Sequence, residues 1–372
     1  MSHSSNANLA ALTAAGVSVW LDDLDRHRIT SGELARMIVA DSVHGVTTNP
    51  SIFDKAISQG ADAYADQLEE LARSGADVDS IIRTLTTDDV RSACDLFLPL
   101  FDQTAGVDGR VSIEVDPRLA RDTHATVEQA RELWRIVDRP NVLIKIPATP
   151  EGLPAITEVI GSGISVNVTL IFSVERYEAV VEAYRAGLEL ARERGHDLST
   201  IHSVASFFIS RIDTEVDARL RALASPTALA LLGQAAVATG RLVWAAHLRS
   251  LSSPEWQSVA TAGGPPQRPL WASTGVKDPS MAPTRYVFDL VVDGCVNTMP
   301  EATLRAVADN GPVPTDTISG TEAASGAVWS ALEGVGISQQ DVSATLEREG
   351  VTKFIDSWEQ LRATVAAAAA GA

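Results

Sequence analysis

Cysteines, long apolar runs and targeting signals are scarce or missing in this sequence, and each shortage excludes a class of protein. The two cysteines, Cys94 and Cys295, make no disulfide framework, which favours a reducing compartment. The first sixteen residues lack the basic start and continuous apolar core of a signal peptide. No stretch approaches the roughly eighteen uninterrupted apolar residues of a membrane span. We therefore expect a cytoplasmic protein with no membrane partner.

Positive charge is also in short supply. Lys and Arg number 30 against 48 Asp and Glu, a formal net charge of −18, so a general nucleic-acid binder is not expected. A few cations in a pocket could still bind a small anionic substrate. The sequence also lacks a P-loop, a GxGxxG motif after a strand, an HExxH zinc motif and a nucleophile elbow. No metal site is expected, because the cysteines share no ligand spacing with the seven histidines.

Short apolar runs alternate with longer helical patterns along the chain. The runs typical of strands cover 17–22, 43–47, 110–115, 141–146, 164–170, 202–207, 269–273 and 287–293, of which the last two have the weakest pattern. Helical spacing marks 30–40, 119–137 and 173–194. This alternation predicts parallel βαβ units, and eight of them predict an α/β fold, a closed (β/α)₈ TIM barrel with additional helices. An open doubly wound sheet is the alternative.

The remaining segments are expected to decorate a single barrel domain spanning 1–372. Residues 1–14 are predicted to be an N-terminal tail. Residues 54–109 and 214–268 are predicted to be helical insertions, and 338–372 a C-terminal helix with a disordered Ala-rich tail. No linker clearly divides the chain into two domains.

Alternation along four strands places polar side chains inside the barrel. Successive side chains of a strand point to opposite faces, and in each of these strands the apolar set has one parity and the polar set the other. The polar set includes Asp22, Glu114, Lys145, Asn167 and Thr169, all towards the C-terminal ends of the strands. We expect these five to converge at the C-terminal mouth, where barrel enzymes carry out their chemistry.

An amine inside such a barrel has two uses. Lys145 could attack a ketone, form a Schiff base and act as an electron sink for breaking the adjacent carbon–carbon bond, with carboxylates as proton shuttles. It could instead form a buried ion pair with Glu114 or Asp22 and do no chemistry. The alternation of side chains alone leaves both readings open.

Longer motifs resemble the transaldolase family. The run Gly45-Val-Thr-Thr-Asn-Pro-Ser-Ile-Phe53 is similar to the family signature after the second strand, although Asn49-Pro50-Ser51 is also an ordinary helix start. It is joined in the family's order by Asp22, by IEVD at 113–116, by LIKI at 143–146, by NVTL at 167–170 and by SFFISRID at 206–213. The resemblance covers 17–213 well and the remainder loosely.

The resemblance implies a role for each matching residue. Lys145 would form the Schiff base, Glu114 and Thr169 would hold a catalytic water, and Asp22 would be the acid/base. The implied substrate-binding residues are Thr47, Asn49, Asn167, Ser206, Phe208, Arg211 and Ser273. The implied reaction transfers dihydroxyacetone from sedoheptulose 7-phosphate to glyceraldehyde 3-phosphate, giving erythrose 4-phosphate and fructose 6-phosphate. It implies a transferase of the pentose phosphate pathway that binds sugar phosphates and uses no cofactor.

Two positions depart from the family pattern. Where many members have a second phosphate-binding arginine after the seventh strand, this chain has Lys277, which we expect to substitute for it as a point charge; an exposed loop lysine is the other reading. Phe207 stands where relatives often have proline.

Two other functions remain open from the sequence. One is an aldolase of the same superfamily that releases free dihydroxyacetone, but its members usually have Tyr where this chain has Phe208, which favours transfer. The other is a silent sugar-phosphate binding protein, for which the full set of Asp22, Glu114 and Lys145 would be superfluous. A monomer or a homodimer is expected.

Overall fold

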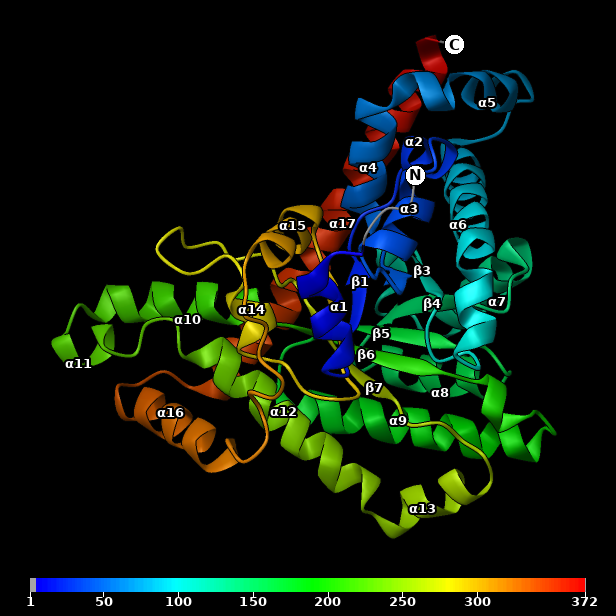
Figure 1. The fold of residues 1–372 in the computed structure, drawn as a ribbon. Helices are drawn as coiled ribbons and strands as arrows, with labels where there is room; N and C mark the ends of the chain where they lie inside the picture. The colour runs from blue at the N-terminus through cyan, green and yellow to red at the C-terminus, as the bar shows by residue number, and fades with distance from the viewer. Residues whose placement is uncertain (1–4, 372) are drawn as a thin grey trace.

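Eight parallel strands close into a barrel in chain order, β1 to β8 (Figure 1). The computed structural model describes residues 5–371. The strands are β1 (Ser18–Leu21), β2 (Gly45–Val46), β3 (Arg110–Glu114), β4 (Val142–Pro147), β5 (Val166–Ile171), β6 (Ser203–Phe208), β7 (Arg268–Ala272) and β8 (Val296–Met299). The predicted (β/α)₈ barrel with additional helices is confirmed, and the open sheet is excluded because β1 pairs with both β2 and β8.

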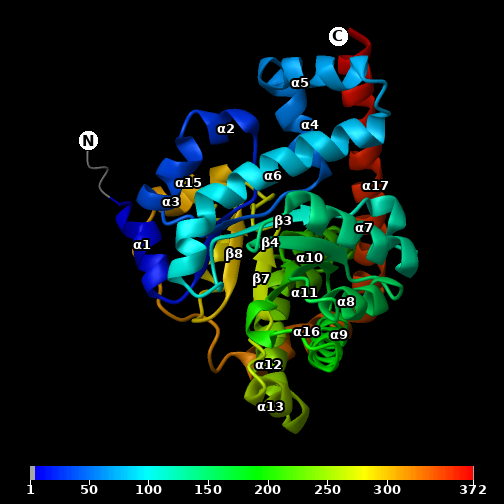
Figure 2. The ribbon, with the colours of Figure 1, turned by 90° about the vertical axis from the view of Figure 1, so that its right-hand side faces the viewer.

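Helices connect the strands and cover the outside of the barrel (Figures 1 and 2). In the first half of the chain these are α1 (Ala7–Ala14), α2 (Arg26–Thr30), α3 (Glu33–Ala40), α4 (Pro50–Gln59), α5 (Ala61–Arg73), α6 (Val78–Gln103), η1 (Pro117–Leu119), α7 (Thr123–Val137), α8 (Gly152–Ile160) and α9 (Val174–Glu193). In the second half they are η2 (Leu198–Thr200), α10 (Ser210–Leu223), α11 (Pro226–Leu229), α12 (Ala235–Leu251), α13 (Pro254–Thr261), α14 (Arg285–Phe288), α15 (Glu301–Asp309), α16 (Glu322–Gly334) and α17 (Gln339–Gly371). Within residues 5–371, no helix combines the length and apolar content needed to cross a membrane.

The predicted position of the last strand is wrong. The apolar run 287–293 forms the end of α14 and the loop after it, where Val287, Leu290 and Val291 are buried without joining the sheet. The strand itself is the following segment, Val296–Met299. Its sequence, VNTM, carries two buried polar residues: Asn297 Nδ2 donates to the Tyr286 carbonyl, and the Thr298 hydroxyl contacts that of Thr47. A strand with these polar groups presents no apolar run.

Both ends of the described chain are more ordered than the sequence suggests. The N-terminal segment expected to be a tail forms α1, which begins at an Asn6 cap and buries Leu9 and Leu12 completely; residues 1–4 of that prediction lie outside the described residues. The Ala-rich segment expected to be disordered continues α17 to Gly371. Leu361 and Val365 of this helix are fully buried just before the Ala-rich run, and Ala368 and Ala369 within it are partly buried against the core.

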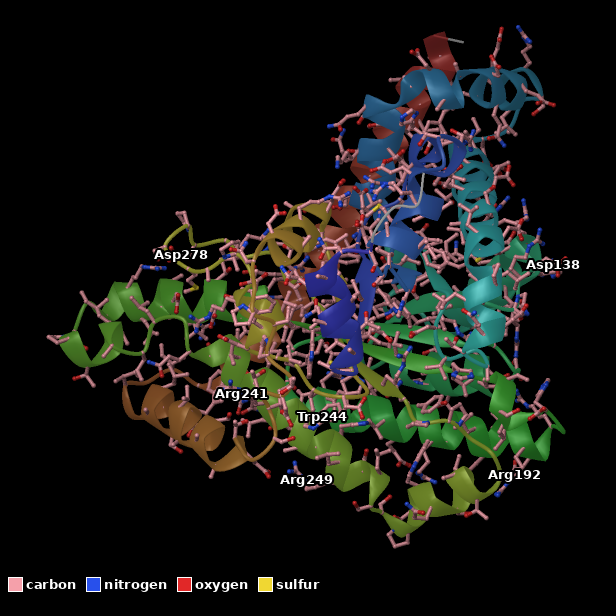
Figure 3. All side chains as sticks on the ribbon, in the orientation of Figure 1. Asp138, Arg192, Arg241, Trp244, Arg249 and Asp278 are labelled. Atoms are coloured by element: carbon pink, nitrogen blue, oxygen red, sulfur yellow. The ribbon has the colours of Figure 1, made fainter. Side chains whose placement is uncertain are left out.

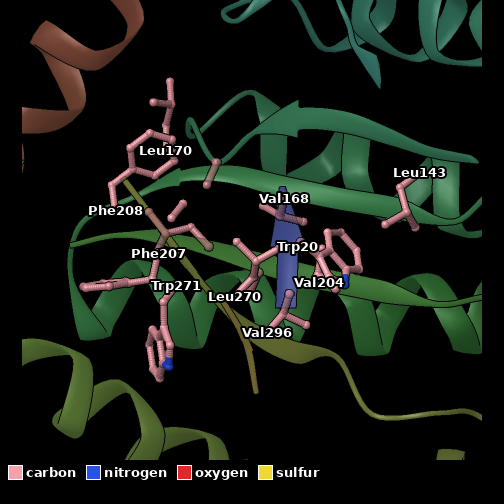
Figure 4. Packing of buried hydrophobic residues seen from close by; sticks show 14 of the residues in the cluster. Trp20, Leu143, Val168, Leu170, Val204, Phe207, Phe208, Leu270, Trp271 and Val296 are labelled. Carbon is pink, nitrogen blue, oxygen red and sulfur yellow. The ribbon is translucent and has the colours of Figure 1, made fainter. Parts of the chain in front are cut away.

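The lower part of the barrel is closed by large apolar side chains. Trp20, Leu143, Val204, Leu270 and Val296 alternate into the lumen from five strands (Figure 4). Gly45 makes room for Trp20, because a Cβ at Gly45 would lie 2.6 Å from the indole ring. Two residues further along the same strands come Asp22, Lys145, Ser206, Ala272 and Thr298, which line the cavity at the mouth. The packed layer therefore forms the floor on which the polar site stands.

Candidate active site

Lys145 and Glu114 face each other from adjacent strands. They are direct partners in the register of β3 and β4, and Lys145 Nζ lies 3.2 Å from Glu114 Oε2, with both side chains 5% exposed. Lys145 Nζ also donates to the Thr48 carbonyl at 3.2 Å. The predicted meeting of an amine and a carboxylate in the lumen is confirmed. This contact is also what a purely structural ion pair would show, so the pair by itself does not separate the two readings.

Burial controls the ionisation of the two carboxyl groups. Removal from water raises the pKa of Glu114 to about 7, and the nearby Lys145 ammonium offsets this only partly. Burial also raises the pKa of Asp22, against the hydrogen bond that the Thr47 hydroxyl donates to it at 2.6 Å. Glu114 is thereby suited to exchange protons near neutral pH.

A chain of hydrogen bonds fixes the amide of Asn167. Its Nδ2 donates to Ser112 Oγ at 3.0 Å, and its Oδ1 accepts from Ser206 Oγ at 2.7 Å. All three residues are buried side chains on β3, β5 and β6. Because both ends of the amide are engaged, its orientation is set before any ligand enters.

Asn49 combines a structural position with a place on the cavity wall. It caps α4 by accepting from the Ile52 amide at 3.1 Å, and Pro50 occupies the first turn. The helix-start reading of this motif is therefore correct. Asn49, Pro50 and Ser51 also line the mouth cavity beside Lys145, so the cap places a polar side chain at the site.

Thr169 lies at an irregularity in β5. The register with β6 shifts between Val168 and Ile171, and Leu170 has a φ of 61°. The Thr169 hydroxyl is fully buried and has no hydrogen-bond partner among the described residues. A buried hydroxyl without a partner costs free energy, and a bound water would relieve that cost.

Arg211, at the start of α10, places a cation at the mouth. Its guanidinium lies 5.0 Å from the centre of the Phe208 ring and 5.8 Å from that of Phe354. Its Nη1 is buried without a hydrogen-bond partner among the described residues. Burial lowers the pKa of Arg211, while Glu114 and Asp22 favour its charged form. Arg211 lines the mouth cavity, and a guanidinium there is suited to receive an anion.

Ser273, after β7, lies beside the same cavity. Its hydroxyl is 2.9 Å from that of Ser210, and it has a φ of 55°. Lys277, by contrast, is exposed and is absent from the residues that line the cavity. Asp278 of the same loop, labelled in Figure 3, accepts from Arg221 of α10 at 3.1 Å. The structure does not bring Lys277 to the site.

The C-terminal helix supplies a wall of the site that the sequence did not indicate. Lys353, Phe354 and Ser357 of α17 line the mouth cavity opposite the strands. Lys145 Nζ lies 5.3 Å from the centre of the Phe354 ring. The helical spacing of 353, 354 and 357 puts them on one face, but only the packing of α17 shows that this face covers the barrel.

The cavity at the mouth has a volume of about 130 Å³. Asp22, Lys145, Arg211 and Lys353 line it, and Glu114, which contacts Lys145, lies outside this lining. Such a site can form an imine with a carbonyl compound and move protons beside it. Within the part of the chain that the structure describes, no cluster of three or more His, Cys, Asp or Glu side chains is placed to hold a metal ion.

Known proteins match almost the whole chain. A family model described as Transaldolase/Fructose-6-phosphate aldolase matches residues 19–365. A transaldolase of Mycolicibacterium smegmatis is 60% identical over 356 residues, which cover 96% of this chain and 96% of the relative. A transaldolase of Thermobifida fusca is 58% identical over 358 residues, 96% of this chain and 97% of the relative. One from Mycobacterium tuberculosis is 58% identical over 357 residues, 96% and 95% of the two chains.

Proposed function

The chain belongs to the transaldolase/fructose-6-phosphate aldolase family, and we propose that Lys145 is the amine that carries dihydroxyacetone between two sugar phosphates. The three relatives described above match nearly end to end and are named transaldolase, so the protein is an enzyme with a transaldolase function, a transferase. The observation that carries the proposal is the buried Lys145 at the base of the mouth cavity, 3.2 Å from a carboxyl group with a raised pKa.

The first half of the reaction breaks the donor. The neutral Lys145 amine attacks the C2 carbonyl of sedoheptulose 7-phosphate, and the carbinolamine loses water to become an iminium ion. Asp22 removes the proton of the C4 hydroxyl, the C3–C4 bond breaks, and its electron pair moves into the iminium to give an enamine. Erythrose 4-phosphate leaves as the aldehyde. The raised pKa of Asp22 supports its assignment as the base.

The second half builds the product. The enamine carbon attacks the aldehyde of glyceraldehyde 3-phosphate, and Asp22 returns its proton to the new alkoxide. Water then adds to the iminium, and fructose 6-phosphate leaves Lys145 as the free amine. Glu114 and Thr169 are assigned to this water. The unpartnered Thr169 hydroxyl and the neutral-range pKa of Glu114 support that assignment.

The remaining residues are assigned to substrate binding. Asn167, Ser206 and Asn49 orient the dihydroxyacetone unit, while Thr47 holds Asp22 in place. Arg211 binds phosphate near Ser273 at the cavity opening. Phe208 on the cavity wall leaves no phenol to assist water there, which supports transfer over release of free dihydroxyacetone. Cytoplasmic location and a monomer or homodimer remain predictions.

Dependence on an acceptor tests this function. Purified protein is supplied with fructose 6-phosphate, with and without erythrose 4-phosphate, and the release of glyceraldehyde 3-phosphate is followed. We expect steady turnover only with the acceptor, since the dihydroxyacetone unit otherwise stays on the lysine. Equal turnover in both assays would identify an aldolase, and no turnover in either would identify a binding protein.

A further inference from the structure

The C-terminal helix is held close to the reacting end of the site. Gly350 of α17 packs on the end of β5, where a Cβ would lie 3.2 Å from both Leu170 Cδ2 and Phe172 Cε2. One turn further on, Lys353 and Phe354 enter the cavity lining. Phe354 is buried and faces both Lys145 and Arg211 with its ring. The close approach at Gly350 therefore determines which side chains of α17 reach the mouth.

The three cations of the site differ in how deeply their side chains are buried. The Lys145 side chain is 5% exposed, Arg211 is partly buried, and the Lys353 side chain is 59% exposed. The first of these is the proposed attacking amine. In a linear sugar phosphate the phosphate lies at the opposite end from the ketone, so it reaches toward the opening. Arg211 and Lys353 are the cations that line that outer part of the cavity.

A carboxylate on the same helix competes for this outer charge. Glu349 Oε2 lies 2.9 Å from Lys353 Nζ, one helical turn away, and it also attracts Arg211 at longer range. Arg211 has no ion-pair partner within 4 Å among the described residues and keeps its buried Nη1 free. A phosphate dianion carries enough charge to engage both cations. Lys353 can leave Glu349 to do so, because its side chain is largely exposed.

We propose that Lys353 is a specificity-determining residue that binds the substrate phosphate together with Arg211, and that Glu349 weakens this binding by holding Lys353 when the site is empty. Lys353 thereby takes the role that the sequence suggested for Lys277. This inference rests on the proposed function for its substrate, but the affinity of the site for phosphate can be measured without turnover.

Two oppositely directed variants test it in the full-length protein. Lys353→Met is expected to raise KM for glyceraldehyde 3-phosphate about tenfold, the usual effect of losing one charge-assisted contact, while KM for unphosphorylated glyceraldehyde stays within about twofold. Glu349→Gln is expected to lower KM for the phosphorylated acceptor about twofold. Lys353→Arg should restore the wild-type ratio. Arg348→Met removes one positive charge from the same helix away from the cavity and serves as the matched control.

Titration calorimetry with inorganic phosphate measures the phosphate affinity of the site without any need for catalysis. We expect weaker phosphate binding by Lys353→Met, tighter binding by Glu349→Gln and unchanged binding by Arg348→Met. Equal phosphate affinity of wild type and Lys353→Met would overturn the inference. An equal rise in KM for glyceraldehyde 3-phosphate and for glyceraldehyde would also overturn it, because it would indicate a structural effect. A wild-type protein that binds phosphate through Lys353 but turns nothing over would refute the proposed function and leave the phosphate site standing.

Discussion

Glu114 is the residue at which burial and charge compete most directly. Its carboxyl group is removed from water beside an amine that favours its ionised form, and burial prevails, raising its pKa to about 7. The neighbouring Lys145 lies 3.2 Å away. A carboxyl group in this state can accept a proton from water above neutrality and return it without a large free-energy change.

The pH dependence of turnover follows from this pKa. Below about pH 7, protonated Glu114 cannot take a proton through the proposed water, so kcat/KM should fall as the pH is lowered through this range. Glu114→Gln should lower kcat/KM about 100-fold or more and remove the inflection near pH 7. Rates measured from pH 5.5 to 9 check this. A wild-type profile that is flat through neutrality, or an inflection that survives in Glu114→Gln, would contradict the assigned role.

Residue patterns predicted the base of the site but not all of its rim. Glu114 and Lys145 could be paired from the sequence because side chains alternate along strands and consecutive parallel strands are neighbours in a barrel. Lys353 could not, because its position depends on how a distant helix packs. Lys277 was favoured because many family members have a phosphate-binding arginine after the seventh strand, but its side chain is exposed and does not line the cavity.

At the scale of elements, α17 connects packing to the site. It contacts α4, α6 and α10 as well as β5 (Figure 2), and it carries Lys353, Phe354 and Ser357 to the cavity. Its helical spacing was visible in the sequence, but its Ala-rich end resembled a disordered tail. Burial of Leu361 and Val365 is a tertiary effect, and local composition does not reveal it. The same holds for β8, whose polar residues find partners only in the folded barrel.

Gly350 tests the dependence of the site on α17. Gly350→Leu adds a side chain where the nearest atoms are 3.2 Å from a Cβ, so either Leu170 and Phe172 or the helix must shift at the mouth. We expect kcat/KM to fall about tenfold or more while the helical circular dichroism is retained. Gly326→Leu in α16, where a Cβ meets nothing within 4 Å, is the matched control and should keep wild-type activity. Equal activity of the two variants would show that the site does not need the close approach of α17.

At the scale of the whole molecule, the two ends of the barrel have separate tasks. The mouth holds the reactive groups, while the base is joined by a buried cluster around Asp108. This carboxylate accepts from the Ser18 hydroxyl at 2.7 Å and pairs with Arg268 at 2.9 Å, which ties β1 to β7. Burial opposes the charge of Asp108, but Arg268, His44 and Ser18 together lower its pKa below the ordinary value of 3.8.

The contribution of the barrel base to the free energy of unfolding should therefore depend on pH. Because the pKa of Asp108 is lower in the folded chain than in the unfolded chain, its contribution is present above about pH 4 and is lost as the pH falls further. Asp108→Asn should lower the free energy of unfolding by about 3 kcal/mol at pH 7 and by less at pH 3, as measured by urea denaturation. Activity of the folded variant at pH 7 should match wild type. If the difference in free energy of unfolding between wild type and Asp108→Asn were independent of pH, the ion-pair explanation would be contradicted.

The central claim is that Lys145 carries the dihydroxyacetone unit, and trapping that intermediate tests it most directly. The chain has four lysines, Lys55, Lys145, Lys277 and Lys353, so peptide mapping can distinguish them. Borohydride is added to protein mixed with fructose 6-phosphate and no acceptor, and the modified peptide is identified by mass spectrometry. We predict one reduced adduct, on Lys145, and neither adduct nor turnover in a folded Lys145→Ala variant. An adduct on another lysine, or normal turnover by Lys145→Ala, would contradict the account.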